Sequence, residues 1–155
     1  METLELKKEC ALKAYNDAKA SGKKLLENLY GKKVFMKDVM ERIKTFKDVL
    51  EDHNMTIEQF EKSCEGLTTD EVGYRKLKLL YKSLNEEYIP DYTDGTSKYQ
   101  PLFKMGSSSG VGFAYHYYDD WLAISCSGSR LCLRSSKLAI YAGKQFLNEH
   151  REFLT

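Results

Sequence analysis

The spacing of hydrophobic positions changes once along the chain, from a helical period to a strand period. Over the first ~90 residues, apolar side chains recur three and four positions apart, which is the repeat of one helix face. The clearest example precedes Pro90 and consists of Leu77, Leu80, Tyr81, Leu84 and Tyr88. This part of the chain is therefore predicted to be helical.

Capping residues and glycines divide the helical part into segments. Thr45, Thr56 and either Thr68 or Thr69 each precede an apolar helical stripe as an N-cap. Gln59 completes a capping box with Thr56, whereas Asp48 and Glu71 follow Thr45 and Thr68 by three residues, where a carboxylate meets the positive end of a helix. Gly31 and Gly66 stand where a last helical turn is expected to end. The predicted helices are 3–20, 23–29 and three that begin at the three threonines, the last of them ending at Pro90.

After Pro101 apolar and polar positions alternate, which is typical of strands with one buried face. The predicted strands are 102–105, 111–118, 121–126 and 130–134. Their short connections indicate antiparallel hairpins, with a tight turn at Asp119–Asp120. Alternation places Phe113, Tyr115 and Tyr117 on one face of the sheet. A serine at 135 or 136 then begins a C-terminal helix that is expected to cover this face.

These patterns predict an α+β fold, in which N-terminal helices precede a small antiparallel sheet of three or four strands and a C-terminal helix packed on it. The predicted domains are a helical region over 1–90, a turn-rich linker over 91–100 and a sheet-and-helix region over 101–155. Together they are expected to form one compact unit, in which residues 1–40 either join the core or form a separate arm.

The composition indicates how large a core the chain can form and how its charge is distributed. With 155 residues, of which 42% are hydrophobic, the chain can build a core without disulfides or a structural metal. Its net charge is only +1, which argues against a general polyanion binder. This total conceals three blocks, with net charges of +4 over residues 1–50, −6 over 51–96 and +3 over 97–155. Such an asymmetry can dock two parts of the chain or mark a partner surface.

No segment has the pattern of a signal peptide or a membrane span. The first nine residues are charged, and the apolar stretches are shorter than the roughly 20 residues that a transmembrane helix needs. Cys10, Cys64, Cys126 and Cys132 form no Cys-x-x-Cys pair and have no histidine at zinc spacing. We expect a cytoplasmic protein with reduced, mostly buried thiols, no metal, no cofactor and no membrane partner.

The densest group of chemically versatile side chains lies in the predicted sheet. Strand alternation predicts a polar face of this sheet, and the Trp121 indole adjoins it. The candidate ligand-binding residues are His116, Tyr118, Trp121, Arg130 and Arg134. Rings and arginines on one sheet face stack bases in some RNA-binding domains. The alternative interpretation is a solvated sheet edge whose arginines form ordinary ion pairs.

Two further motifs contain residues that carry chemistry in other proteins. The glycine-rich segment 106–112 lacks the lysine of a Walker loop and precedes a predicted strand, so we interpret it as a hairpin connection. His116 lies near Asp119 and Asp120, a combination that can serve acid–base catalysis, but the two aspartates are predicted to form a turn. We therefore predict no catalytic residues and a protein that is not an enzyme.

Three segments resemble a known family. They are Ile43–Asp48, Asn85–Pro90 and the run 128–146, which is similar to the pattern G-S-R-L-C-F-K-S-x-E-L-A-x-Y-A-G-x-Q-F. The family comprises short uncharacterised proteins encoded by phages and prophages of gut Bacteroides-type bacteria, and the resemblance covers residues ~40–155. The chain departs from the pattern at Leu133, Arg134 and Lys137. The resemblance implies a phage origin and assigns no catalytic residue.

Together these observations predict a phage or prophage accessory protein that acts by binding in the cytoplasm of the bacterial host cell. A host protein is the first expectation for its partner, with a phage protein as a second possibility. Two alternatives stay open, namely binding of a nucleotide or single-stranded nucleic acid on the polar sheet face, and a minor structural or assembly role in a virion. The sequence does not predict the oligomeric state.

Overall fold

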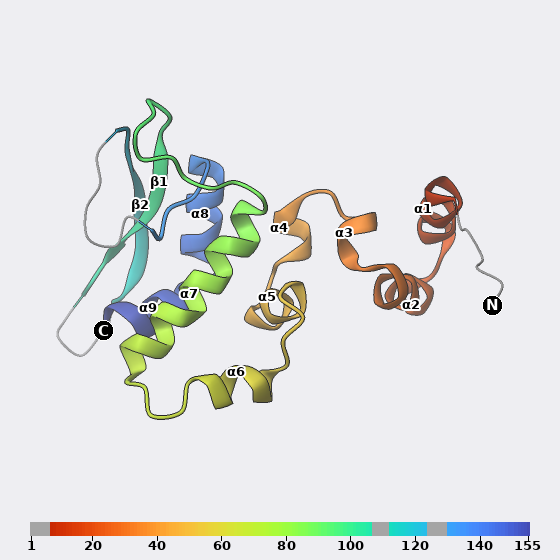
Figure 1. The fold of residues 1–155 in the computed structure, drawn as a ribbon, viewed down its shortest axis with the longest axis horizontal. Helices are drawn as coiled ribbons and strands as arrows, with labels where there is room; N and C mark the ends of the chain where they lie inside the picture. Colours follow the sequence, from red (N-terminus) through yellow and green to blue (C-terminus); the bar gives the residue numbers. More distant parts are fainter. Residues whose placement is uncertain (1–6, 107–111, 124–129) are drawn as a thin grey trace. The chain divides into compact units, whose positions relative to one another are not determined.

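A computed structural model describes residues 7–106, 112–123 and 130–155 (Figure 1). The chain is an α+β protein, as the sequence predicts, and it divides into two compact units, Met1–Arg42 and Ile43–Thr155. The first unit is helical. The second contains helices, an antiparallel strand pair and the C-terminal helices.

The first unit consists of α1 (Lys8–Asp17), α2 (Ala20–Tyr30), α3 (Lys32–Phe35) and α4 (Val39–Arg42). The Tyr15 ring stacks on Phe35 at 4.4 Å, and the Tyr15 hydroxyl donates to Glu27 at 2.5 Å, which joins α1 to α2 and α3. The expected break near Gly22 is wrong, because the chain turns at Ala18 instead and Gly22 lies inside α2. A Cβ at position 22 would lie 3.1 Å from the Ala18 Cβ, so glycine permits this tight return.

Three capped helices open the second unit, namely α5 (Phe46–Asp52), α6 (Ile57–Ser63) and α7 (Thr69–Asn85). The predicted caps at Thr45 and Thr56 are confirmed, Thr68 and not Thr69 is the N-cap of α7, and a capping box forms at all three threonines. The predicted α7 stripe is also confirmed, because Leu77, Leu80, Tyr81 and Leu84 are buried. The helix ends earlier than expected, at Asn85, and the following Glu86 has a positive φ of 55°.

Within the described residues the sheet has two strands, β1 (Lys98–Lys104) and β2 (Ala114–Trp121), which pair antiparallel. The predicted turn at Asp119–Asp120 is wrong. Both aspartates lie inside β2, because β1 begins at Lys98, within the predicted linker, and supplies their pairing partners Gln100 and Tyr99. A third and a fourth strand are not found in the described segments. Of the predicted strand 130–134 only a single bridge exists, between Leu133 and Tyr99, and residues 124–126 lie outside the described residues.

A β-bulge changes which side chains share a face of the sheet. Leu102 pairs with Tyr117 but Phe103 pairs with Tyr115, so His116 has no partner on β1. Tyr115 and Tyr118 therefore lie at positions on the same side of the sheet, whereas the backbone position of Tyr117 falls on the other side. The Tyr117 ring is 57% exposed and stacks on the neighbouring Tyr118 ring. The prediction that Tyr115 and Tyr117 share a face is wrong, because one extra residue reverses the alternation.

The start of β1 is fixed by a buried lysine. The Lys98 side chain is fully buried, and its ammonium group donates to Asp94 at 2.5 Å and to the Thr96 carbonyl at 2.9 Å. A buried charge needs such partners, so the preceding loop wraps around the ammonium group. This contact explains why part of the predicted linker is ordered strand.

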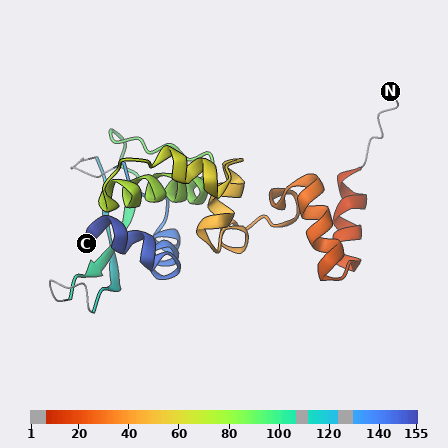
Figure 2. The same ribbon diagram turned by 90° about the horizontal axis from the view of Figure 1, so that it is seen from below.

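The predicted C-terminal helix is present as two helices, α8 (Ser136–Gln145) and α9 (Leu147–Leu154), which meet at Phe146. Helix α8 packs on both strands, and Gly143 allows the approach because a Cβ there would overlap Tyr115 and lie 2.8 Å from Pro101. Helix α9 lies alongside α7 (Figure 1, Figure 2), where a Cβ at Gly73 would come within 2.5 Å of the Phe153 nitrogen. The core of the second unit therefore lies between α7, the C-terminal helices and the sheet.

Candidate interaction site

Two apolar depressions of the second unit border α6. Two adjoining hollows of about 480 and 340 Å³ share Lys47, Leu50 and Ile57 as lining residues, and we call them together the α6 groove. Apolar side chains from α5, α6 and α7 form its wall, namely Phe46, Leu50, Ile57, Phe60 and Val72. The groove belongs entirely to the second unit.

Local sequence signals build the walls of the groove. Helices α5 and α6 have only seven residues each, so neither would be stable alone. Their capping boxes satisfy the first backbone amides, and the Phe46 ring meets the Phe60 ring edge-on at 5.1 Å between centroids. Asn54 makes the turn between them in a left-handed conformation, which asparagine tolerates better than most residues. The result is a pair of short helices that contact each other, with α5 packed on α7.

Ile57 is the unusual residue of the groove. It is the first residue of α6 and leaves 48% of its surface exposed, whereas Leu50 and Phe60 beside it are almost fully buried. Its side chain lines both hollows, as do Lys47 and Leu50. An apolar side chain that leaves about half of its surface exposed beside two apolar hollows suits contact with another molecule.

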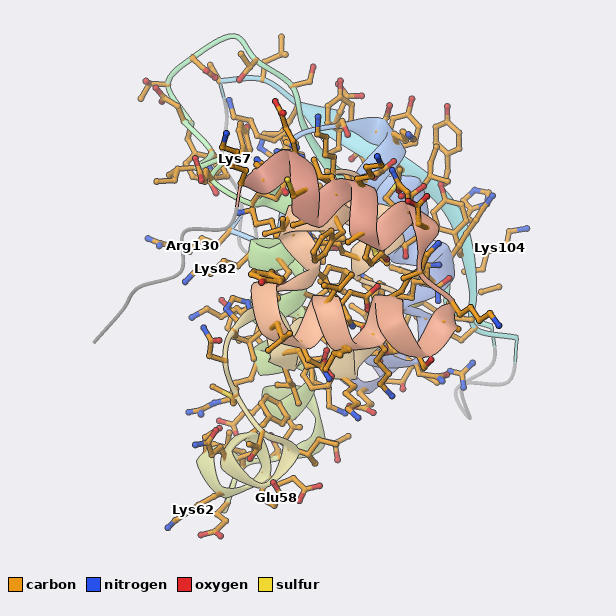
Figure 3. The ribbon with its side chains drawn as sticks, turned by 90° about the vertical axis from the view of Figure 1, so that its right-hand side faces the viewer. Lys7, Glu58, Lys62, Lys82, Lys104 and Arg130 are labelled. Carbon is orange, nitrogen blue, oxygen red and sulfur yellow. The ribbon has the colours of Figure 1, made fainter. Side chains whose placement is uncertain are left out.

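The rim of the groove is acidic. Glu51, Glu58 and Glu61 line the hollows. A hydrogen bond with Thr56, followed by one with the backbone, holds the pKa of the Glu58 carboxyl below its ordinary value, so this group stays charged. Figure 3 shows Glu58 and Lys62 extending from α6 at the lower end of the view.

Two lysines also line the groove, but one is already engaged. Lys76 forms an ion pair with Glu152 at 2.6 Å, and its ammonium group lies 5.6 Å from the centre of the Phe46 ring. Lys47 is exposed. With three carboxylates against two lysines, the lining of the groove has a net charge of −1, and its apolar surface is bordered by more acidic than basic side chains.

A third depression lies on the other side of Phe60 and has the opposite charge. It measures about 500 Å³ and includes Tyr74, Arg75 and Lys78. The Arg75 guanidinium donates to the Ser63 carbonyl at 2.7 Å, and the Lys78 ammonium group lies 5.8 Å from the Tyr74 ring centre. The rim of this depression is basic, so it should not favour the positively charged ligands that the acidic residues of the α6 groove attract.

The candidate residues predicted from β2 lie in different surroundings. His116 is exposed at the bulge. Tyr118 is half-buried, stacked on Tyr117 at 4.6 Å, and a hydrogen bond with Tyr117 raises the pKa of the Tyr118 hydroxyl. Trp121 is half-buried and pairs with Lys98 at the start of β1. The bulge thus separates His116 from the regular face that sequence alternation assigned to it.

The two candidate arginines lie after the sheet. Arg130 is exposed, and Figure 3 shows it on the opposite side of the view from Lys104 of β1. Arg134 donates to the Asn85 carbonyl at 3.1 Å and to the Glu86 carboxylate at 2.9 Å, so it is tied to the end of α7. In the parts of the chain that the structure describes, no hydrogen bond or ring contact joins any two of the five predicted residues.

The sequence did not indicate the α6 groove. The period of Ile57, Phe60 and Cys64 assigned all three to one buried stripe, yet only Phe60 is buried. The sequence feature that could have indicated the groove is the position of Ile57 directly after the cap Thr56, where it begins a helix of only seven residues.

Three further features limit the chemistry of the described residues. Within them, no three His, Cys, Asp or Glu side chains are grouped to hold a metal ion. No described helix is both long and apolar enough to cross a membrane. Cys10 is exposed, Cys64 half-buried and Cys132 buried, all as free thiols, and burial raises the pKa of the Cys132 thiol.

Neither protein-family models, curated proteins nor solved structures match this chain.

Proposed function

We propose that this chain is a non-enzymatic phage or prophage accessory protein that binds a helical segment of a host protein in the α6 groove. The observation that carries the proposal is the pair of apolar hollows around half-exposed Ile57. The phage origin is supported by the segments that resemble a phage family, above all residues 128–146.

The walls and the rim of the groove define the chemistry of its partner. An amphipathic helix binds an apolar groove through side chains three or four positions apart, which lie on one helix face. Two adjoining hollows suit two such anchors. Because Glu51, Glu58 and Glu61 border the groove, a helix with lysine or arginine beside its anchors gains electrostatic complementarity. The partner segment is therefore a basic amphipathic helix.

A direct test uses a labelled basic amphipathic peptide with leucines four positions apart, measured by fluorescence anisotropy. The variant Ile57→Glu places a charge between the hollows, and Ile89→Glu is a matched control because Ile89 is 85% exposed and lies outside the groove. Loss of one buried aliphatic contact is worth roughly 1.5–3 kcal/mol, or about tenfold or more in Kd. We expect I57E to weaken binding by at least this factor and I89E to leave it unchanged.

Two outcomes contradict the proposal. One is that the wild-type chain does not bind the basic peptide, or binds an acidic peptide of the same pattern equally well. The other is that I57E binds as tightly as I89E. A labelled single-stranded oligonucleotide serves as a second probe, and its binding, if weakened by Arg134→Gln but not by I57E, would instead favour the nucleic-acid alternative.

A further inference from the structure

Helix α2 of the first unit has an exposed apolar stripe. Leu25 is 59% exposed and Leu29 is 64% exposed, and their spacing of four residues puts them on one helix face, one turn apart. The other side of α2 is engaged within the first unit, where Glu27 accepts a hydrogen bond from Tyr15 and Lys23 lies over the Tyr15 ring. The leucines therefore do not contribute to the core of their own unit.

The surroundings of this stripe are basic. Lys24 is exposed one residue before Leu25, and Lys32 and Lys33 follow the helix directly. Residues 7–42 contain ten lysine and arginine residues against five acidic ones, a net charge of +5. Helix α2 itself carries Lys23 and Lys24 against Glu27, so it is an amphipathic helix of small positive charge, with two apolar anchors, in a basic unit.

The two apolar anchors and the neighbouring lysines of α2 are complementary to the α6 groove. The groove offers two adjoining hollows to the two leucines, and its carboxylates face a helix that carries lysines. The two leucines lie one helical turn apart, roughly 6 Å along the axis of α2, and the two hollows adjoin at their shared residues Lys47, Leu50 and Ile57. The basic depression on the other side of Phe60 would repel the same helix, because Arg75 and Lys78 line it.

We propose that the α6 groove of one copy of this chain binds α2 of a second copy. This inference rests on the groove of the proposed function and adds a regulation, because self-association and partner binding would compete for one site. The contact is heterologous, since two different surfaces meet, so each chain carries one helix to donate and one groove to fill. The concentration of the protein then sets how many grooves are open to a partner.

Complementation between two variants tests the proposal. I57E blocks the groove and keeps α2 intact, whereas the double variant Leu25→Ser/Leu29→Ser removes the anchors and keeps the groove. Both changes affect exposed side chains, so both chains should fold. Sedimentation velocity should show concentration-dependent association of the wild-type chain, and each variant alone should raise the dissociation constant of self-association about tenfold or more. An equimolar mixture of the two should form a 1:1 heterodimer.

The control variant is Leu154→Ser, which alters a 40% exposed leucine in α9 and should associate like the wild-type chain. The inference is overturned if the wild-type chain is monomeric at all concentrations, if L25S/L29S associates normally, or if the mixed variants stay monomeric. The wild-type chain could also be monomeric while L25S/L29S binds the peptide more tightly. This result would mean that α2 fills the groove of its own chain, and it would also overturn the inference of a contact between two copies. In both monomeric cases, peptide binding that I57E weakens would leave the proposed function standing.

Discussion

His150 in α9 is a buried, neutral histidine whose titration should control the acid stability of the protein. Its Nδ1 donates to the Phe146 carbonyl at 2.7 Å, which leaves Nε2 unprotonated to accept the Tyr81 hydroxyl at 3.1 Å. The ring is 2% exposed and lies 4.7 Å from the Phe103 ring. Burial lowers the pKa of His150 from 6.5 to about 4, although the bond to Phe146 acts in the opposite direction.

The sign of the pH dependence follows from this direction. The folded protein holds the imidazole neutral while the unfolded chain protonates it near pH 6.5, so the unfolded state binds more protons between these two pKa values. The stabilisation is complete above the unfolded pKa and is lost as pH falls through the folded pKa of about 4. From about pH 7.5 to about pH 5, the loss in free energy of unfolding amounts to about 2 kcal/mol.

Urea denaturation followed by circular dichroism across this pH range measures the effect. We expect the wild-type free energy of unfolding to fall by about 2 kcal/mol as pH falls across this range. In His150→Gln, position 150 cannot titrate, so the free energy of unfolding should depend less steeply on pH. The control His116→Gln changes an exposed histidine, and its free energy of unfolding should depend on pH as in the wild-type chain. Glu149, whose pKa is raised by desolvation, is common to all three chains, so its contribution cancels in the comparison. A His150 resonance that titrates near pH 6.5, or an unchanged slope in H150Q, would refute the reasoning.

Two further changes test the packing of the second unit. Gly143→Ala should lower the free energy of unfolding despite a gain of about 1 kcal/mol in helix propensity, because the new Cβ would overlap Tyr115 and approach Pro101, and overpacking costs roughly 1–3 kcal/mol. A Tm above that of the wild-type chain would contradict this. Asn85→Ala should cost about 2 kcal/mol in urea denaturation, because buried Asn85 donates to the Cys132 carbonyl at 2.8 Å. A loss below about 0.5 kcal/mol would show that this hydrogen bond is not important.

The sequence by itself determined the features that depend on neighbours in the chain. The capping boxes at Thr45, Thr56 and Thr68 require only residues three positions apart, and all three form. The buried face of α7 was equally predictable, because one helix period decides which side chains line up. The α+β class followed from the change of period after Pro101.

Only the tertiary structure decided the features that depend on distant partners. Asp119 and Asp120 suit a turn locally, but residues 99 and 100 pair with them and extend the strand. The bulge at His116 arises from the register between two strands, and a single extra residue reverses every side chain beyond it. Alternation alone therefore could not assign the polar face correctly.

The same reasoning applies to the candidate sites. Arg134 was predicted on a sheet face, whereas its partner Glu86 lies 48 residues away at the end of α7. Ile57 has the spacing of a core residue, and only the packing of α5, α6 and α7 shows that nothing covers half of its surface. Local periodicity specifies which face a side chain occupies, but burial depends on which element covers that face, and such long-range contacts form only when the chain folds.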